Sequence, residues 1–201
     1  MQTLILGSSS PFRAELLGKL NLPFTTVSPD IDESPLQGES AMALVERLAQ
    51  QKVKVIAEQH PRALIIGSDQ VAVIGQHIIG KPRNHLNAVE QLKMASGKTV
   101  QFLTGLALYN AQDKTMQSLV EPFNVTFRSL TDLDIENYLI AEKPYQCAGS
   151  FKSEGLGICL FSQLHGDDPN SLIGLPLIQL SRLLNNAGVN VLASQIKDKQ
   201  Q

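Results

Sequence analysis

The segment LILGSSSPFRAELLGKL, residues 4–20, decides how this chain begins to fold. Its apolar residues 4–6 predict a short buried strand, and Gly7 permits a turn directly after it. Pro11 is a residue type favoured at the first position of a helix. Leucines at positions 16, 17 and 20 then predict one apolar helix face. The segment therefore predicts a strand, a tight turn and a helix in close succession.

Three serines, Ser8, Ser9 and Ser10, lie between this strand and this helix. A helix N-terminus offers free backbone N–H groups and a positive dipole end, which attract anions. Arg13 adds a forked cation that matches phosphate oxygens. The segment fits a phosphate site, and it equally fits an ordinary capped helix after an edge strand.

Composition excludes several classes of protein. The 201 residues carry a formal charge of −2, which argues against non-specific nucleic-acid binding. No apolar run approaches the roughly 20 residues that a membrane helix needs. Cys147 and Cys159 have no metal-ligand spacing, and the histidines form no zinc motif. Because the N-terminus also shows no basic leader, we expect a cytoplasmic protein with no membrane partner.

Apolar periodicity predicts alternating elements along the rest of the chain. We expect a helix capped by Ser40 and ended by Pro61, then a buried strand, a tight polar turn at SDQ, a second strand, a hairpin at Gly75 and a third strand. A helix capped by Asn84 should run through Met94. The other expected elements are strands at 24–27, 99–109, 115–128 and 158–164, helices at 132–140 and 175–187, and a frayed tail at 190–201.

This order of elements predicts an α/β fold, with a mixed twisted sheet flanked by helices. We expect residues 1–201 to form a single domain of two lobes around a central cleft, because polar motifs follow predicted strands in both halves.

Acids and lysines follow several of these elements. Glu33 ends the acidic run DIDE, Asp69 follows an apolar strand, Lys52 lies on the long helix, and Lys81 lies in GKP. Carboxylates that hold a divalent cation, together with cations that hold phosphate, are what phosphoryl or nucleotidyl hydrolysis requires. Each motif also has an ordinary explanation as a turn, a hairpin or a solvated loop. Their joint occurrence favours the catalytic interpretation.

The chain resembles the Maf family of nucleoside-triphosphate pyrophosphatases. The motifs that carry the resemblance cover almost the whole chain in the family's order: GSSSPFRAELL, DIDES, IIGSDQVAV, GKP, CAGSFKSEG and NSLIGLPL. The resemblance implies a fold like that of inosine triphosphate pyrophosphatase. It also implies cleavage between the α- and β-phosphates, Mg²⁺ or Mn²⁺ as cofactor, and often a homodimer.

The resemblance assigns roles residue by residue. Asp69 matches the catalytic proton acceptor, and Glu33 matches an acid that shares metal binding with it. Four further positions match residues expected to grip the triphosphate: Ser8, Arg13, Lys52 and Lys81.

Three departures from the family's common pattern concern base selectivity: Phe12, Gln70 and Glu154. Together they resemble the branch that acts on 7-methyl-GTP. Methylation at N7 makes the guanine ring cationic, so Phe12 could offer it an aromatic face. Glu154 could accept charge-assisted hydrogen bonds from the base edge, and Gln70 could contact the other side. The ordinary alternative is that Phe12 is a core residue of the first helix and Glu154 a solvated loop acid.

Three alternatives stay open at this point. The closest is pyrophosphatase activity on dTTP or UTP. A second is a nucleotide-binding regulator of cell division, because the family's name is tied to septum inhibition. A third is nucleic-acid binding, against which the near-neutral charge counts.

Overall fold

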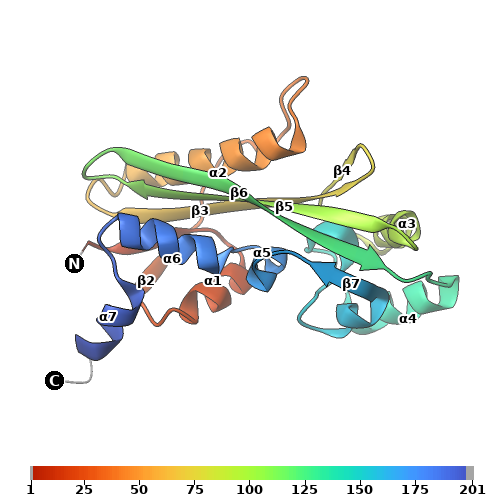
Figure 1. Ribbon diagram of the computed structural model, residues 1–201. Helices are drawn as coiled ribbons and strands as arrows, with labels where there is room; N and C mark the ends of the chain where they lie inside the picture. Colours follow the sequence, from red (N-terminus) through yellow and green to blue (C-terminus); the bar gives the residue numbers. More distant parts are fainter. Residues whose placement is uncertain (1, 198–201) are drawn as a thin grey trace. The chain divides into compact units, whose positions relative to one another are not determined.

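A computed structural model of the protein describes residues 2–197. In these residues the strands form a seven-stranded sheet in the order β2-β1-β3-β5-β6-β7, with β4 paired to β3 (Figure 1). The strands are β1 (Leu4–Gly7), β2 (Phe24–Val27), β3 (Leu64–Ile74), β4 (His77–Ile79), β5 (Thr99–Asn110), β6 (Thr115–Phe127) and β7 (Phe161–His165). The α-helices are α1 (Pro11–Gly18), α2 (Ala41–Ala57), α3 (His85–Ala95), α4 (Asp132–Glu142), α5 (Pro169–Ile173), α6 (Leu177–Asn186) and α7 (Val191–Lys197), and two 3₁₀ helices are η1 (Ala148–Ser150) and η2 (Leu156–Leu160).

The sheet is mixed, as the sequence predicts. Strand β1 runs parallel to both β2 and β3, and its last pair joins Gly7 to Gly67. Strands β3 and β4 are antiparallel, with a turn at Gly75 (φ +61°). The expected α/β class with a mixed sheet and flanking helices is therefore confirmed.

Polar caps set where the helices begin. The side chains of Ser40 and Asn84 accept hydrogen bonds from the backbone three residues on, at 3.2 and 2.9 Å, which confirms both predicted caps. Thr131 and Asp134 form a reciprocal capping box at the start of α4. Because these signals are local in sequence, the starts of these helices could be predicted.

The described residues divide into two compact units. The first contains residues 2–69, 104–121 and 174–197, and the second contains residues 70–103 and 122–173. Each has its own apolar core. Among residues 2–197, no helix combines the length and apolar character that crossing a bilayer demands.

In the first unit, α2 lies unusually close to one face of the sheet, and α1 and α6 lie on the other (Figure 1). Glycines make this approach possible. A Cβ at Gly67 would overlap the carbonyl of Ala49, and one at Gly105 would overlap the carbonyl of Val45. At Gly7 a Cβ would lie 2.8 Å from Cδ1 of Ile56. The close approach brings the α2 side chains down to the sheet surface.

The second unit is built around aromatic rings. Phe151 packs edge-to-face against Phe102, Phe127 and Phe161, with ring centroids 4.8–5.7 Å apart. Helices α3 and α4 pack against each other beside this cluster. The arrangement gives this unit a rigid core next to the segment of residues 152–156.

Three expectations are wrong. SDQ forms no turn, because Asp69 lies inside the continuous strand β3, where its side chain and those of its neighbours find partners without a turn. Residues 158–160 belong to η2, so the strand there begins only at Phe161. Residues 191–197 form α7, of which Gln195 donates to the carbonyl of Leu20 at 3.0 Å. The last residues of the expected tail, 198–201, lie outside the described part.

Candidate functional site

The site begins at the carboxyl end of β1, where the chain bends into α1. The Ser8 side chain is buried, and its Oγ accepts a hydrogen bond from the Ser10 backbone at 3.1 Å. Ser10 caps α1 by accepting from the Arg13 backbone N–H at 3.4 Å. The hydroxyls therefore shape the bend, and Arg13 emerges from the first turn of the helix.

The Arg13 side chain is anchored by its inner nitrogen. Nε donates to the carbonyl of Gly174 at 2.9 Å, which fixes the plane of the guanidinium group. Burial lowers the pKa of Arg13, whereas the negative charges of Asp69 and Glu33 raise it. The group remains a cation and lies within the electrostatic reach of both carboxylates.

The same carbonyl holds a second donor. Ser68, which is fully buried, donates from Oγ to the Gly174 carbonyl at 2.9 Å. Gly174 has a φ of +123°, a conformation that residues with a Cβ rarely adopt. Sequence reasoning missed the roles of Ser68 and Gly174, because no local pattern links positions 106 residues apart.

On the opposite face of β3, Asp69 meets α2. Side chains alternate along a strand, so Asp69 shares the α2-covered face with Gly67 and Ile65. Nζ of Lys52 lies 2.6 Å from Asp69 Oδ1 and 2.7 Å from Glu33 Oε1. The Lys52 and Asp69 side chains are 6% and 12% exposed, whereas that of Glu33 is 57% exposed. One ammonium group therefore holds two carboxylates between α2 and β3.

The loop that carries Glu33 is tied to α2. Arg47 donates to both carboxylate oxygens of Glu39, at 2.6 and 2.8 Å, and to the Ser34 carbonyl at 3.1 Å. The side-chain hydrogen bonds from Arg47, with one from the Leu36 backbone, lower the pKa of Glu39 to about 2. These contacts hold the residue after Glu33 at a fixed place on α2.

The donor set suits a hard divalent cation. Mg²⁺ in proteins uses one or two carboxylates and completes its shell with water and substrate phosphates. Glu33 and Asp69 provide two carboxylates that already share one positive group, the Lys52 ammonium. In residues 2–197, no cluster of three or more His, Cys, Asp or Glu side chains forms a fuller cage.

In the second unit, Gln70 is held by backbone carbonyls. Its Nε2 donates to Ser171 at 2.7 Å and to Leu172 at 3.2 Å. The buried side chain of Asp168 shapes that turn by accepting from the backbone and the side-chain amide of Asn170, each at 2.8 Å. The donor end of Gln70 is therefore oriented by the backbone of α5.

Lys81 and Glu154 lie in exposed loops of the same unit. Both act electrostatically on the Cys147 thiol. The pKa of Cys147 is raised to about 11, mainly by burial and then by the negative charge of Glu154, while the charges of Lys152 and Lys81 act to lower it. Both charges therefore lie within electrostatic reach of the same thiol.

Phe12 lies in the first turn of α1, next to Arg13, and is half-buried. In the first unit the structure thus brings together Glu33, Lys52 and Asp69. The charges of the two carboxylates also act on Arg13, and Ser8 lies at the bend before α1.

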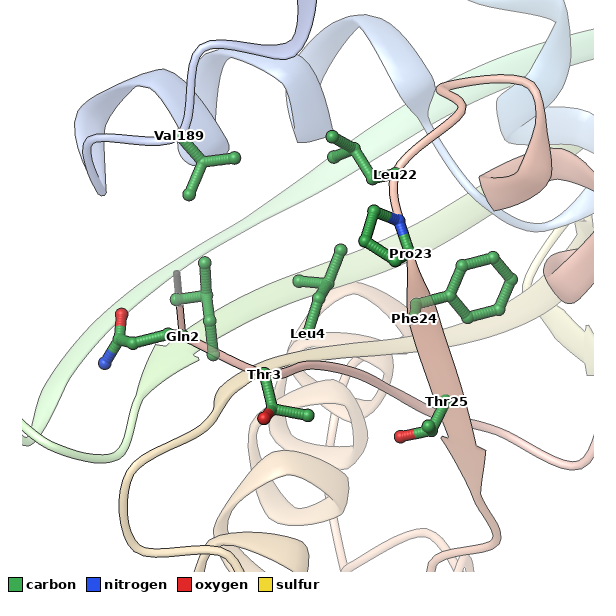
Figure 2. A pocket seen from close by; sticks show the side chains of 9 residues that line it. Gln2, Thr3, Leu4, Leu22, Pro23, Phe24, Thr25 and Val189 are labelled. Atoms are coloured by element: carbon green, nitrogen blue, oxygen red, sulfur yellow. The ribbon is translucent and has the colours of Figure 1, made fainter. Parts of the chain in front are cut away.

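A separate apolar cavity of about 330 Å³ opens at the amino ends of β1 and β2 (Figure 2). Leu4, Leu22, Pro23 and Val189 are among its lining residues. None of the predicted site residues lines it. Ligands of parallel sheets bind at the carboxyl ends of strands, and this cavity lies at the other end.

Known proteins resemble the chain over nearly its whole length. The model of the family described as "Maf-like protein" matches residues 3–187. A protein of Colwellia psychrerythraea named "7-methyl-GTP pyrophosphatase" is 60% identical over 198 residues, 98% of each chain. Proteins with the same name from Nitrosococcus oceani and Pseudoalteromonas translucida are 58% and 57% identical, covering 94% and 96% of this chain and 96% and 95% of their own.

Proposed function

The chain belongs to the Maf-like protein family, and we propose that it hydrolyses 7-methyl-GTP to 7-methyl-GMP and pyrophosphate. The observation that carries the proposal is the pairing of one ammonium group, that of Lys52, with both Asp69 and Glu33, just beyond the Gly7–Gly67 pair that ends the parallel pairing of β1 with β3. Relatives that bear this activity in their names match the chain almost end to end. Removal of modified nucleotides such as 7-methyl-GTP from the nucleotide pool is the cellular role that this reaction suggests.

In the proposed reaction, a water oxygen forms a bond to the α-phosphorus and the bond to the α–β bridging oxygen breaks. The bridging oxygen leaves with pyrophosphate, and the water proton passes to the Asp69 carboxylate. A positioned general base of this kind contributes about 10²- to 10⁴-fold to the rate. The residues that bind phosphate oxygens are Ser8, Arg13, Lys52 and Lys81. Lys52 also keeps the two carboxylates in place.

Glu33 and Asp69 are the residues that would hold a divalent cation, Mg²⁺ or Mn²⁺. When bound, the cation neutralises phosphate charge and polarises the phosphoryl oxygens. A chelator should therefore abolish turnover, and added Mg²⁺ or Mn²⁺ should restore it. Full activity after exhaustive chelation would refute the proposed role of the metal.

We assign base selectivity to Phe12, Gln70 and Glu154. A cationic 7-methylguanine gains about 0.5–2 kcal/mol from an aromatic face such as that of Phe12. Glu154 accepts hydrogen bonds from the base edge, and its negative charge makes them stronger than those to an amide. Gln70 contacts the base from a position fixed by its backbone partners.

One substrate panel tests the proposal. Pyrophosphate release is measured with 7-methyl-GTP, GTP, dTTP and UTP, for the wild type and for Glu154→Gln. We expect the highest kcat/KM with 7-methyl-GTP, and a lower ratio of 7-methyl-GTP to GTP activity in the variant. Preference for dTTP or UTP would support the rival specificity. Tight nucleotide binding without turnover would instead support a regulator of cell division.

A matched control is Glu136→Gln, since Glu136 is a half-exposed acid whose carboxylate lies 3.0 Å from His85 Nε2. It should keep the wild-type substrate ratio. An unchanged ratio in Glu154→Gln would exclude Glu154 as a base-reading residue.

The cytoplasmic location and the homodimer stay predictions.

A further inference from the structure

The segment of residues 152–156, which carries Glu154, is held at both ends by the last residue of α4. The Lys152 ammonium donates to the Glu142 carbonyl at 3.1 Å and lies 3.6 Å from Glu142 Oε2. The Leu156 backbone N–H donates to Glu142 Oε1 at 3.1 Å. Glu154 is the middle residue between these two fixed points.

Two further contacts make the segment compact. Tyr138, one turn earlier on α4, accepts a hydrogen bond from the Lys152 backbone at 3.0 Å. A Cβ at Gly155 would lie 2.8 Å from Glu142 Oε1, and one at Gly157 would overlap the Lys152 carbonyl. Gly155 therefore lets the backbone around Glu154 approach α4, and Gly157 lets the chain fold back onto Lys152.

The Glu142 side chain is only 19% exposed, whereas Glu154 is exposed. An exposed glutamate gains selectivity only when its backbone is fixed, because a mobile loop would lose the geometry of its hydrogen bonds. We propose that Glu142 is a positioning residue for base selectivity, acting through the segment of residues 152–156. The inference rests on the proposed function, in which Glu154 contacts the base.

The test compares Glu142→Ala and Glu142→Gln with Glu136→Ala, a change of a half-exposed acid on the same helix. For each variant, kcat/KM is measured with 7-methyl-GTP and with GTP, and folding is checked by thermal melting. In Glu142→Ala we expect the ratio of the two kcat/KM values to fall about tenfold, because the selective contact is misplaced. Glu142→Gln keeps an oxygen for the Leu156 N–H and should retain most of the ratio, as should Glu136→Ala.

A double-mutant cycle separates positioning from a general loss of structure. Adding Glu142→Ala to Glu154→Gln should change the ratio little further, because both act through the same contact. An unchanged ratio of the two kcat/KM values in Glu142→Ala, whether activity on both substrates falls equally or not at all, would overturn the inference. If Glu142→Ala fails to fold, Tyr138→Phe removes one anchor of Lys152 and should lower the ratio in the same direction; an unchanged ratio there would count against the inference. A wild type inactive on 7-methyl-GTP would refute the proposed function itself, which the wild-type measurement shows before any variant is made.

Discussion

Replacing Lys52 by methionine should both destabilise the protein and stop turnover. Methionine keeps the length and apolar stem of the side chain but removes the ammonium that lies 2.6 Å from Asp69 and 2.7 Å from Glu33. Asp69, with its side chain only 12% exposed, would lose this cation, whereas Glu33 at 57% exposed can be solvated by water.

The magnitude follows from these exposures. Breaking a fully buried ion pair costs about 3–5 kcal/mol, because one charge is left without compensation. Since only the Asp69 side of this cluster is buried, we expect a loss of about 2 kcal/mol in the free energy of unfolding. In a chain of this size that loss lowers Tm by roughly 4–8 °C.

Urea unfolding measures the effect, provided that the slope m stays unchanged. Lys54→Met is the matched control, because Lys54 is exposed on the same helix, and it should stay within about 0.5 kcal/mol of the wild type. Adding Asp69→Asn to Lys52→Met should restore part of the lost stability, since the uncompensated charge is gone. A Lys52→Met protein as stable as the Lys54 control would refute the reasoning.

Three further predictions concern the same unit. Asp69→Asn should keep the fold and lower kcat for pyrophosphate release by about 10²- to 10⁴-fold, and a residual rate above roughly a tenth would exclude a general base. Because the pKa of Glu39 is lowered in the folded protein, its ionised carboxylate stabilises the fold at pH values above 4.5, the ordinary pKa of the group. This contribution is lost as the pH falls toward about 2. Thermal melts of Glu39→Gln and wild type should therefore differ at neutral pH and converge in acid; a constant difference would contradict this. Gly174→Ala places a Cβ 3.2 Å from Arg13 Nε and should raise KM, whereas Gly188→Ala, with positive φ but no crowding, should lower Tm without changing KM. Equal KM values in the two glycine variants would show that the anchoring of Arg13 by Gly174 does not contribute to substrate binding.

Local signals account for what the sequence predicted correctly. The caps at Ser40 and Asn84 act on backbone groups three residues away, and the apolar period of each helix is set by its own residues. The α/β class follows from the same local patterns. The short helix at 191–197 was missed because its polar surroundings resemble a frayed end.

The sequence by itself determined which residue types are present for chemistry, where most elements begin, and the family to which the chain belongs. Only the tertiary structure decided that SDQ continues a strand, so that Asp69 faces Lys52 on α2 while Ser68 faces the carbonyl of Gly174. Considered without the rest of the fold, a polar triplet such as SDQ satisfies its hydrogen bonds in a turn. Inside a sheet its alternate side chains find partners on both faces, and those partners come from segments distant in sequence.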